Sequence, residues 1–172
     1  MLRSLGALLL AAGLLVAGCG NSEDGQDAGP NQEGSTDVTA GDTGVQVEGA
    51  LDAKPTINLP GGEPPAELVS TDIAEGEGEA VPAGATVTTH YVGVSWSTGQ
   101  EFDSSWDRGQ PAEFPLSRVI AGWTEGIPGM KIGGRRLLVI PSELAYGQTP
   151  PPGAGIAPGE TLVFVIDMVS VA

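Results

Sequence analysis

Cysteine and histidine, which often serve as nucleophiles, bases and metal ligands, are scarce in this chain of 172 residues. The chain has one cysteine, Cys19, and one histidine, His90. A catalytic triad needs a nucleophile and an orienting acid around its histidine, and a zinc site needs further nitrogen or sulfur ligands. The acidic residues also lack the spacing of a calcium loop. We therefore expect no metal and no cofactor, and we expect His90 to be an ordinary strand residue.

Aromatic residues are more numerous than cysteine and histidine, and all of them lie between positions 91 and 164. Because aromatic side chains bury the largest areas in a core, their distribution predicts a single small domain in the C-terminal two-thirds and excludes a multidomain enzyme. From Ala66 onward, five basic residues accompany 13 acidic ones, which argues against nucleic acid as a partner. The eight aromatic residues are Tyr91, Trp96, Phe102, Trp106, Phe114, Trp123, Tyr146 and Phe164.

The elements that must position these residues are mostly strands. Residues 86–96, 134–141 and 161–171 have the apolar patterns of strands, and 97–100 has the composition of a turn. The only substantial helix candidate lies between 119 and 127, where two glycines and a proline keep it short. The predicted fold class is therefore α+β, an antiparallel sheet packed on one short helix. In the last strand, alternation places Leu162, Phe164, Ile166 and Met168 on one face, and Val163, Val165, Asp167 and Val169 on the other.

Some conspicuous side chains have simpler structural interpretations. Trp96 and Trp106 are expected at the surface or in packing contacts. The adjacent Arg135 and Arg136 are expected to be a solvated, salt-bridging pair on an acidic domain.

Several short motifs in a fixed order resemble those of one known family. Over residues 68–172 the chain closely resembles the FKBP family of peptidyl-prolyl cis-trans isomerases. This resemblance implies a curved antiparallel sheet wrapped around one short helix, with a hydrophobic cavity between them that takes a proline ring. The motifs are Tyr91, Phe102-Asp103-Ser104-Ser105, Asp107-Arg108-Gly109, Phe114-x-Leu116-x-x-Val119-Ile120-x-Gly122-Trp123, Gly129-Met130-x-x-Gly133, Ala145-Tyr146-Gly147 and Leu162-Val163-Phe164.

The resemblance also implies a role for individual residues. Trp123 would be the floor of the proline pocket, and Tyr146 and the backbone N–H of Ile120 would donate hydrogen bonds to a substrate carbonyl. Asp103 would lie beside the twisted amide, held by Tyr91 and Arg108. Ile156 would lie on a loop that overhangs the site. The walls of the pocket would be Tyr91, Phe102, Val119, Ile120 and Phe164.

Three departures from the family pattern affect the rim of the site. Ala112 stands where many relatives have an aromatic wall residue, Ala157 replaces a common proline, and residues 149–152 replace the usual loop tip. The implied ligands are proline-containing segments of exported proteins and macrolide inhibitors, and the departures affect the contacts that flank the proline.

Cis-trans rotation of an X-Pro bond does not require catalysis by an acid, a base or a nucleophile. Rotation about an X-Pro amide loses C–N resonance at a cost of about 18–20 kcal/mol, and no bond to the protein has to form. Two hypotheses fit such a site: a folding catalyst, and a non-catalytic module that binds proline-containing segments or serves as a scaffold. Tyr91, Asp103, Trp123 and Tyr146 are all present, which favours catalysis.

The N-terminal segment has the features of a targeting signal. Arg3 precedes an apolar run from Leu5 to Ala17 that is too short to span a bilayer. The small residues before Cys19 resemble the lipobox of bacterial lipoproteins, which implies removal of residues 1–18 and lipidation of Cys19. The alternative is an ordinary secretory signal that happens to contain a cysteine.

The remaining sequence predicts the domain organisation. Residues 19–44 are expected to be the lipidated cysteine and a disordered acidic tether. Residues 45–65 would be an extended segment or an extra edge strand, and 66–172 the isomerase domain. We therefore expect an exported monomer that is anchored by lipid to the outer face of the bacterial cell membrane.

Overall fold

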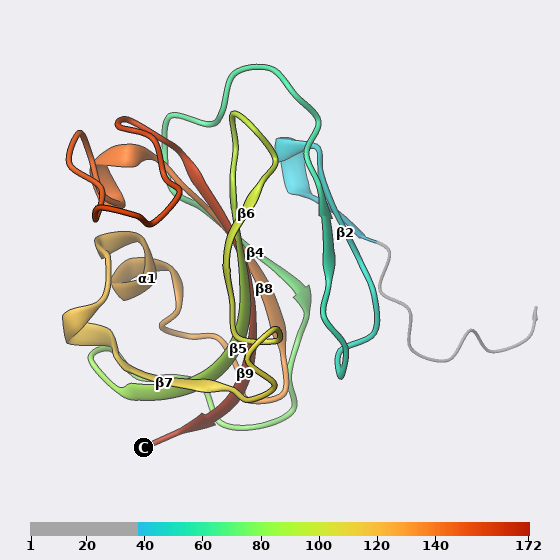
Figure 1. Cartoon of the computed structure of the whole chain (residues 1–172). Helices are drawn as coiled ribbons and strands as arrows, with labels where there is room; N and C mark the ends of the chain where they lie inside the picture. The colour runs from blue at the N-terminus through green and yellow to red at the C-terminus, as the bar shows by residue number, and fades with distance from the viewer. Residues whose placement is uncertain (1–37) are drawn as a thin grey trace, which may run out of the picture. The chain divides into compact units, whose positions relative to one another are not determined.

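An antiparallel six-stranded sheet forms the centre of the computed structural model, which describes residues 38–172 (Figure 1). The order of its strands is β4-β8-β9-β5-β6, and β7 also pairs with β5. One short helix, α1, covers one face, so the predicted α+β fold is confirmed. The strands are β4 (Val69–Ala74), β5 (Thr86–Ser95), β6 (Glu101–Ser104), β7 (Ala112–Pro115), β8 (Arg135–Ile140) and β9 (Leu162–Val171), and the helical turns are η2 (Leu116–Arg118), α1 (Ala121–Gly126) and η3 (Ser142–Leu144).

Strand β5 organises the sheet around the site. Along one side it pairs with β9, from Val87 opposite Val171 to Ser95 opposite Leu162. Along the other side, its first residues pair with β7 and its last residues pair with β6. The change of partner leaves the middle of β5, which contains Tyr91, beside the gap between β6 and β7.

The two faces of the sheet belong to two different hydrophobic clusters. Leu162, Phe164, Ile166 and Met168 of β9 join the cluster on the helix side. The alternate residues Val163 and Val165 join the cluster on the opposite side. The predicted division of this strand into two faces is therefore confirmed for these six residues, although both faces are buried and neither is solvated.

Two glycines let helix α1 approach the sheet closely. A Cβ atom at Gly122 would lie 2.4 Å from Ile140 Cγ2, and one at Gly126 would lie 2.7 Å from Leu138 Cδ2. These distances are below normal contact, so a larger residue at either position would push the helix away from β8. Besides limiting the length of the helix, the glycines therefore set its distance from the sheet.

A second, smaller sheet covers the other face of the main sheet (Figure 1). It consists of β1 (Val38–Ala40), β2 (Val45–Glu48) and β3 (Thr56–Asn58), with the short turn η1 (Gly41–Thr43) between β1 and β2. In β2, the fully buried Val45 and Val47 alternate with exposed polar residues. The valines pack in the same cluster as the outer face of β8 and β9.

This small sheet corrects two expectations. The strands within residues 45–65 are not edge strands of the main sheet, because β2 pairs with β1 on one side and with β3 on the other. The expected tether of residues 19–44 ends earlier, because β1 and η1 already belong to the small sheet. The physical reason is that the apolar outer face of the main sheet needs a cover. Residues 1–18, Cys19 and the rest of the predicted tether lie outside the described residues.

Arg135 joins the small sheet to the large one and is fully buried, contrary to the expectation of a solvated pair. Its guanidinium donates to both carboxylate oxygens of Asp167, at 2.5 and 2.7 Å. It also donates to the backbone carbonyl oxygens of Gly49 and Ala53, in the loop between β2 and β3. Arg136 is also largely buried and pairs with Asp72. Ion pairing was expected for both arginines, and burial was not.

Within residues 38–172, no helix is long and apolar enough to cross a membrane.

We predict that Arg135→Met lowers the free energy of unfolding by about 3–5 kcal/mol, because it leaves the Asp167 carboxylate buried without a partner. The double variant Arg135→Met/Asp167→Leu should recover much of this loss, since an apolar pair has no charge to desolvate. Urea unfolding of both proteins measures the difference. Lys131→Met removes an exposed ion pair with Glu75 and serves as the control, with an expected loss much smaller than that of Arg135→Met. Equal losses at positions 131 and 135 would contradict this account of Arg135.

Candidate functional site

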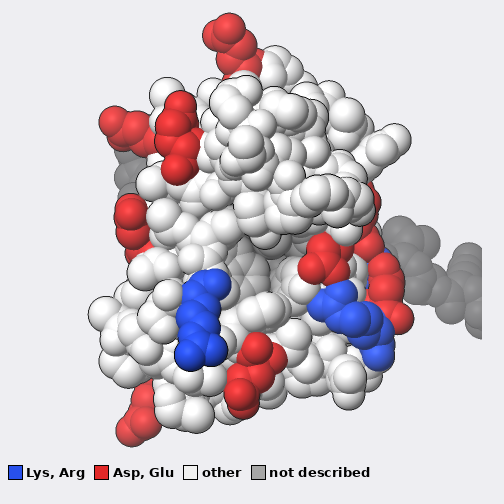
Figure 2. All heavy atoms as spheres, turned by 60° about the vertical axis from the view of Figure 1, so that its left-hand side comes forward, with Lys and Arg blue, Asp and Glu red and all other residues white. Residues whose placement is uncertain are grey.

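A cavity of about 430 Å³ lies on the helix side of the sheet. Figure 2 shows it as a hollow in a mostly uncharged part of the surface, with basic and acidic side chains at its rim. Its walls come from β5, β6, β7, β9, the segment from η2 to α1, and the loop after η3. The lining residues are Tyr91, Phe102, Asp103, Phe114, Arg118, Val119, Ile120, Trp123, Tyr146 and Phe164.

Trp123 is held in the cavity by three aromatic neighbours. Its ring meets Tyr91, Phe114 and Phe164 edge to face, with ring centroids 5.3–5.5 Å apart and interplanar angles of 80–85°. Such contacts stabilise a pair by about 0.5–1.5 kcal/mol beyond the buried area. Because the indole is 4% exposed and supported on three sides, it provides a rigid apolar surface against which a small ring can pack.

Asp103 is the acidic residue of the cavity, and both of its carboxylate oxygens are already engaged. The hydroxyl of Tyr91 donates to Oδ2 at 2.6 Å, and Arg108 Nη1 donates to Oδ1. Arg108 Nη2 also donates to the Tyr91 hydroxyl, at 2.6 Å. The three side chains thus form a closed hydrogen-bonded ring that fixes the carboxylate at the cavity wall.

This ring shifts the ionisation of its members. Burial opposes the charged form of Asp103, but the hydrogen bonds from Tyr91 and Arg108 outweigh it and lower the pKa of the carboxyl below 3.8. Burial and the hydrogen bond to Asp103 raise the pKa of Tyr91 to about 12. At neutral pH the site therefore holds a carboxylate and a neutral tyrosine, and neither group is suited to exchange a proton.

The Tyr146 hydroxyl and the Ile120 backbone N–H are hydrogen-bond donors of the site that remain without an acceptor in the described part of the chain. The hydroxyl of Tyr146 makes no hydrogen bond there, in contrast to the doubly engaged hydroxyl of Tyr91. Burial raises the pKa of Tyr146, so its proton is retained at neutral pH. The backbone N–H of Ile120 likewise has no acceptor among residues 38–172, while its carbonyl accepts from the N–H groups of Trp123 and Thr124. Both donors are available to a ligand carbonyl.

The structure brings eight of the ten site residues expected from the sequence to the cavity lining. Arg108 does not line the cavity but orients Asp103 and Tyr91. Ile156 is partly buried against the helix-side core and is not a lining residue, so its position over the pocket stays a prediction. Two lining residues were missed: Phe114, which belongs to a quoted motif, and Arg118, which falls on an unspecified position of one.

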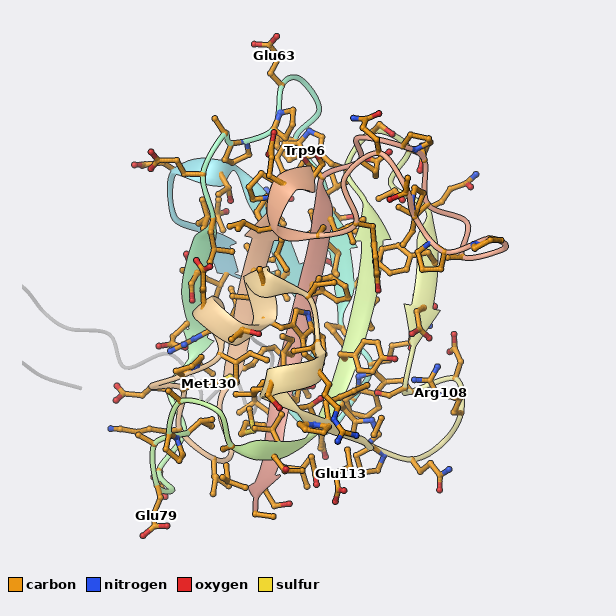
Figure 3. All side chains as sticks on the ribbon, turned by 90° about the vertical axis from the view of Figure 1, so that its left-hand side faces the viewer. Glu63, Glu79, Trp96, Arg108, Glu113 and Met130 are labelled. Atoms are coloured by element: carbon orange, nitrogen blue, oxygen red, sulfur yellow. The ribbon has the colours of Figure 1, made fainter. Side chains whose placement is uncertain are left out.

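His90 and the other two tryptophans serve packing. His90 lies in β5, stacks on Trp106 at 4.0 Å and is within 3.0 Å of the Ser105 hydroxyl. Trp96 is buried in the outer cluster, and its indole N–H donates to the carbonyl of Gly62. In Figure 3, Trp96 and Arg108 lie toward opposite ends of the molecule. Among the described residues, no three histidines, cysteines or acids are grouped as metal ligands.

Comparison with known proteins agrees with this geometry. Residues 77–169 match the family described as FKBP-type peptidyl-prolyl cis-trans isomerase. Over 120 residues the chain is 58% identical to the FK506-binding protein of Streptomyces anulatus, covering 69% of this chain and 97% of that protein. The chain belongs to the FKBP-type peptidyl-prolyl cis-trans isomerases.

Solved structures give the same result for the fold. The crystal structure of FkpA from Escherichia coli is 46% identical, with a TM-score of 0.56, over 60% of this chain and 47% of that one. The crystal structure of AtFKBP13 is 38% identical, also with a TM-score of 0.56, over 63% of this chain and 95% of that one. The chain thus spans about half of the FkpA chain and nearly all of AtFKBP13.

We predict that Asp103→Asn destabilises the protein by about 1–2 kcal/mol at pH 7. This is the lower part of the range for hydrogen bonds to a charged group, because the Asp103 side chain is 43% exposed. Since folding lowers the pKa of Asp103, its contribution is complete above its unfolded value and disappears as the pH falls through the folded value, below 3.8. Urea unfolding of both proteins between pH 2 and 7 should show two curves that converge only in acid. A constant difference across this range would contradict the assigned charge.

Proposed function

We propose that this protein accelerates cis-trans rotation of X-Pro bonds in exported proteins at the outer face of the bacterial cell membrane. The observation that carries the proposal is an apolar cavity with an aromatic floor and two unengaged donors at its wall, Tyr146 and the N–H of Ile120. A cavity of about 430 Å³ can accept a proline ring with part of its flanking backbone. It holds no arrangement for nucleophilic attack.

The proposed mechanism is preferential binding of the twisted amide. Planar X-Pro bonds resist rotation because resonance couples nitrogen and carbonyl. With the proline ring packed on Trp123, the carbonyl of the preceding residue can rotate to accept from the two donors. Only interactions that are stronger in the twisted state accelerate rotation, and each 1.36 kcal/mol of such preference gives about a tenfold increase in rate.

Asp103 acts in this scheme as a fixed charge. As conjugation is lost, the carbonyl carbon becomes more positive, and a nearby carboxylate stabilises that change. Tyr91 and Arg108 are positioning residues, because they hold the carboxylate and keep it ionised. The carboxylate accepts no proton during the reaction, since the amide gains and loses none.

The proposed location rests on the N-terminal sequence. Residues 1–18 have the pattern of a signal peptide, and Cys19 follows the small residues Val16, Ala17 and Gly18. Two or more acyl chains on one cysteine would give a stable anchor, at about 0.8 kcal/mol for each buried methylene. The polar segment after Cys19 would separate the folded domain from the bilayer.

We predict that the full chain accelerates a proline-limited refolding reaction and that Tyr146→Phe lowers kcat/KM about tenfold. The variant removes one donor of about 1.4 kcal/mol to the twisted carbonyl but keeps the ring. Trp106→Phe changes an aromatic residue outside the cavity and should retain the original rate. Failure of the unmodified chain to accelerate refolding would favour the non-catalytic binding module. Equal rates for Tyr146→Phe and the parent would remove Tyr146 from the mechanism.

We further predict that Cys19→Ala abolishes membrane attachment. The chain would either leave the membrane fraction or retain its N-terminal segment, because acylation and processing both depend on the thiol. Mass spectrometry and membrane fractionation of cells that express the two forms measure the outcome. Normal processing together with membrane retention of Cys19→Ala would contradict the anchor.

A further inference from the structure

The described part of the chain contains six basic side chains, and five of them are neutralised within the fold. Lys54 pairs with Glu101 and Asp107, and Lys131 with Glu75. The remaining three are Arg108, Arg135 and Arg136, which pair with Asp103, Asp167 and Asp72 respectively. Arg118 is the exception, because it forms no ion pair and no side-chain hydrogen bond with any residue of the range 38–172. This is unexpected on a chain with 22 acidic residues and a net charge of −15.

The unpaired arginine lies at the site. Arg118 ends η2, is exposed to solvent, and lines the cavity next to Val119 and Ile120. The backbone of η2 is well anchored. Leu116 is fully buried, its N–H donates to the carbonyl of Ala85, and its carbonyl accepts from the Thr124 hydroxyl at 2.7 Å. The turn therefore holds Arg118 at the rim of the cavity, while its long side chain keeps the freedom to reach a ligand.

The two charged residues of the cavity lining differ in what they can still bind. Asp103 has both oxygens occupied by Tyr91 and Arg108. Arg118 has a complete set of five N–H donors without a partner in the described chain. A guanidinium in this state matches a carboxylate, to which it can donate two parallel hydrogen bonds. The charge that this cavity can recognise is therefore negative.

We propose that Arg118 is a specificity-determining residue that favours substrates with an acidic side chain within two positions of the proline. The inference rests on the proposed function, since it names the substrate class of the same cavity. Arg118 binds the substrate beside the reacting bond and takes no part in the rotation. An exposed ion pair of this kind should change kcat/KM about two- to fivefold, and added salt should weaken the effect because both charges are in contact with solvent.

The test uses the purified full chain and short peptides with one proline. In each peptide pair, Glu or Gln occupies the same position, and the position is moved through the two residues on either side of the proline. The measured quantity is the ratio of kcat/KM for the Glu peptide to that for its Gln partner. It is compared between the parent, Arg118→Gln, Arg118→Glu and the control Lys131→Gln, which removes one exposed positive charge away from the cavity lining.

The expected ratio in the parent is about two- to fivefold above one for at least one peptide position, and it should decline in 0.5 M salt. Arg118→Gln should bring the ratio to about one, Arg118→Glu below one, and Lys131→Gln should keep the parent ratio. A ratio of one at every position in the parent, or a preference that survives Arg118→Gln, would overturn the proposal while isomerase activity stands. If no peptide were isomerised faster than without the protein, the proposed function would fail, and this inference with it.

Discussion

Burial of both faces of the central sheet is the constraint on which the rest of the structure depends. Strands β8 and β9 place apolar side chains on both sides, so neither face can be left in water without loss of the hydrophobic stabilisation. Helix α1 covers one face and the small sheet β1-β2-β3 covers the other. The site exists because the helical cover is short. Six residues of α1 cannot span a face built from strands of up to ten residues, and aromatic side chains line the remaining space.

Tyr91 connects this core to the polar part of the site. Its ring is 5% exposed and packs against Trp123 and Phe114, while its hydroxyl belongs to the ring of hydrogen bonds with Asp103 and Arg108. One side chain thus supports the apolar floor and fixes the carboxylate. This dual contact explains why the second tyrosine, Tyr146, is the one left to donate to a ligand. A hydroxyl already committed to Asp103 has no proton to offer.

Local sequence patterns predicted the parts of the fold that depend on neighbouring residues. The alternation in residues 161–171 assigned Leu162 and Val163 to opposite faces, and the interrupted apolar run after Val119 located the short helix. The small sheet could not be derived in the same way, because its partner is a surface formed by strands distant in sequence. Arg135 is buried because the small sheet packs over it. Two adjacent arginines on an acidic chain give no local indication of such burial. Arg118 was missed because its importance lies in the absence of a partner, which only the complete set of contacts reveals.

The net negative charge of the chain and the unpaired Arg118 affect an anionic peptide at different distances from the protein. Charges in 0.15 M salt are screened beyond about 8 Å, so the acidic surface repels an anionic peptide only weakly until it is close to the protein. Within the cavity, the carboxylate of Asp103 is already balanced by Arg108, and the local field is therefore dominated by Arg118. A chain of net charge −15 can thus present a positive site to its substrate. The five other described lysines and arginines differ from Arg118 in that each is already balanced by a carboxylate of the fold.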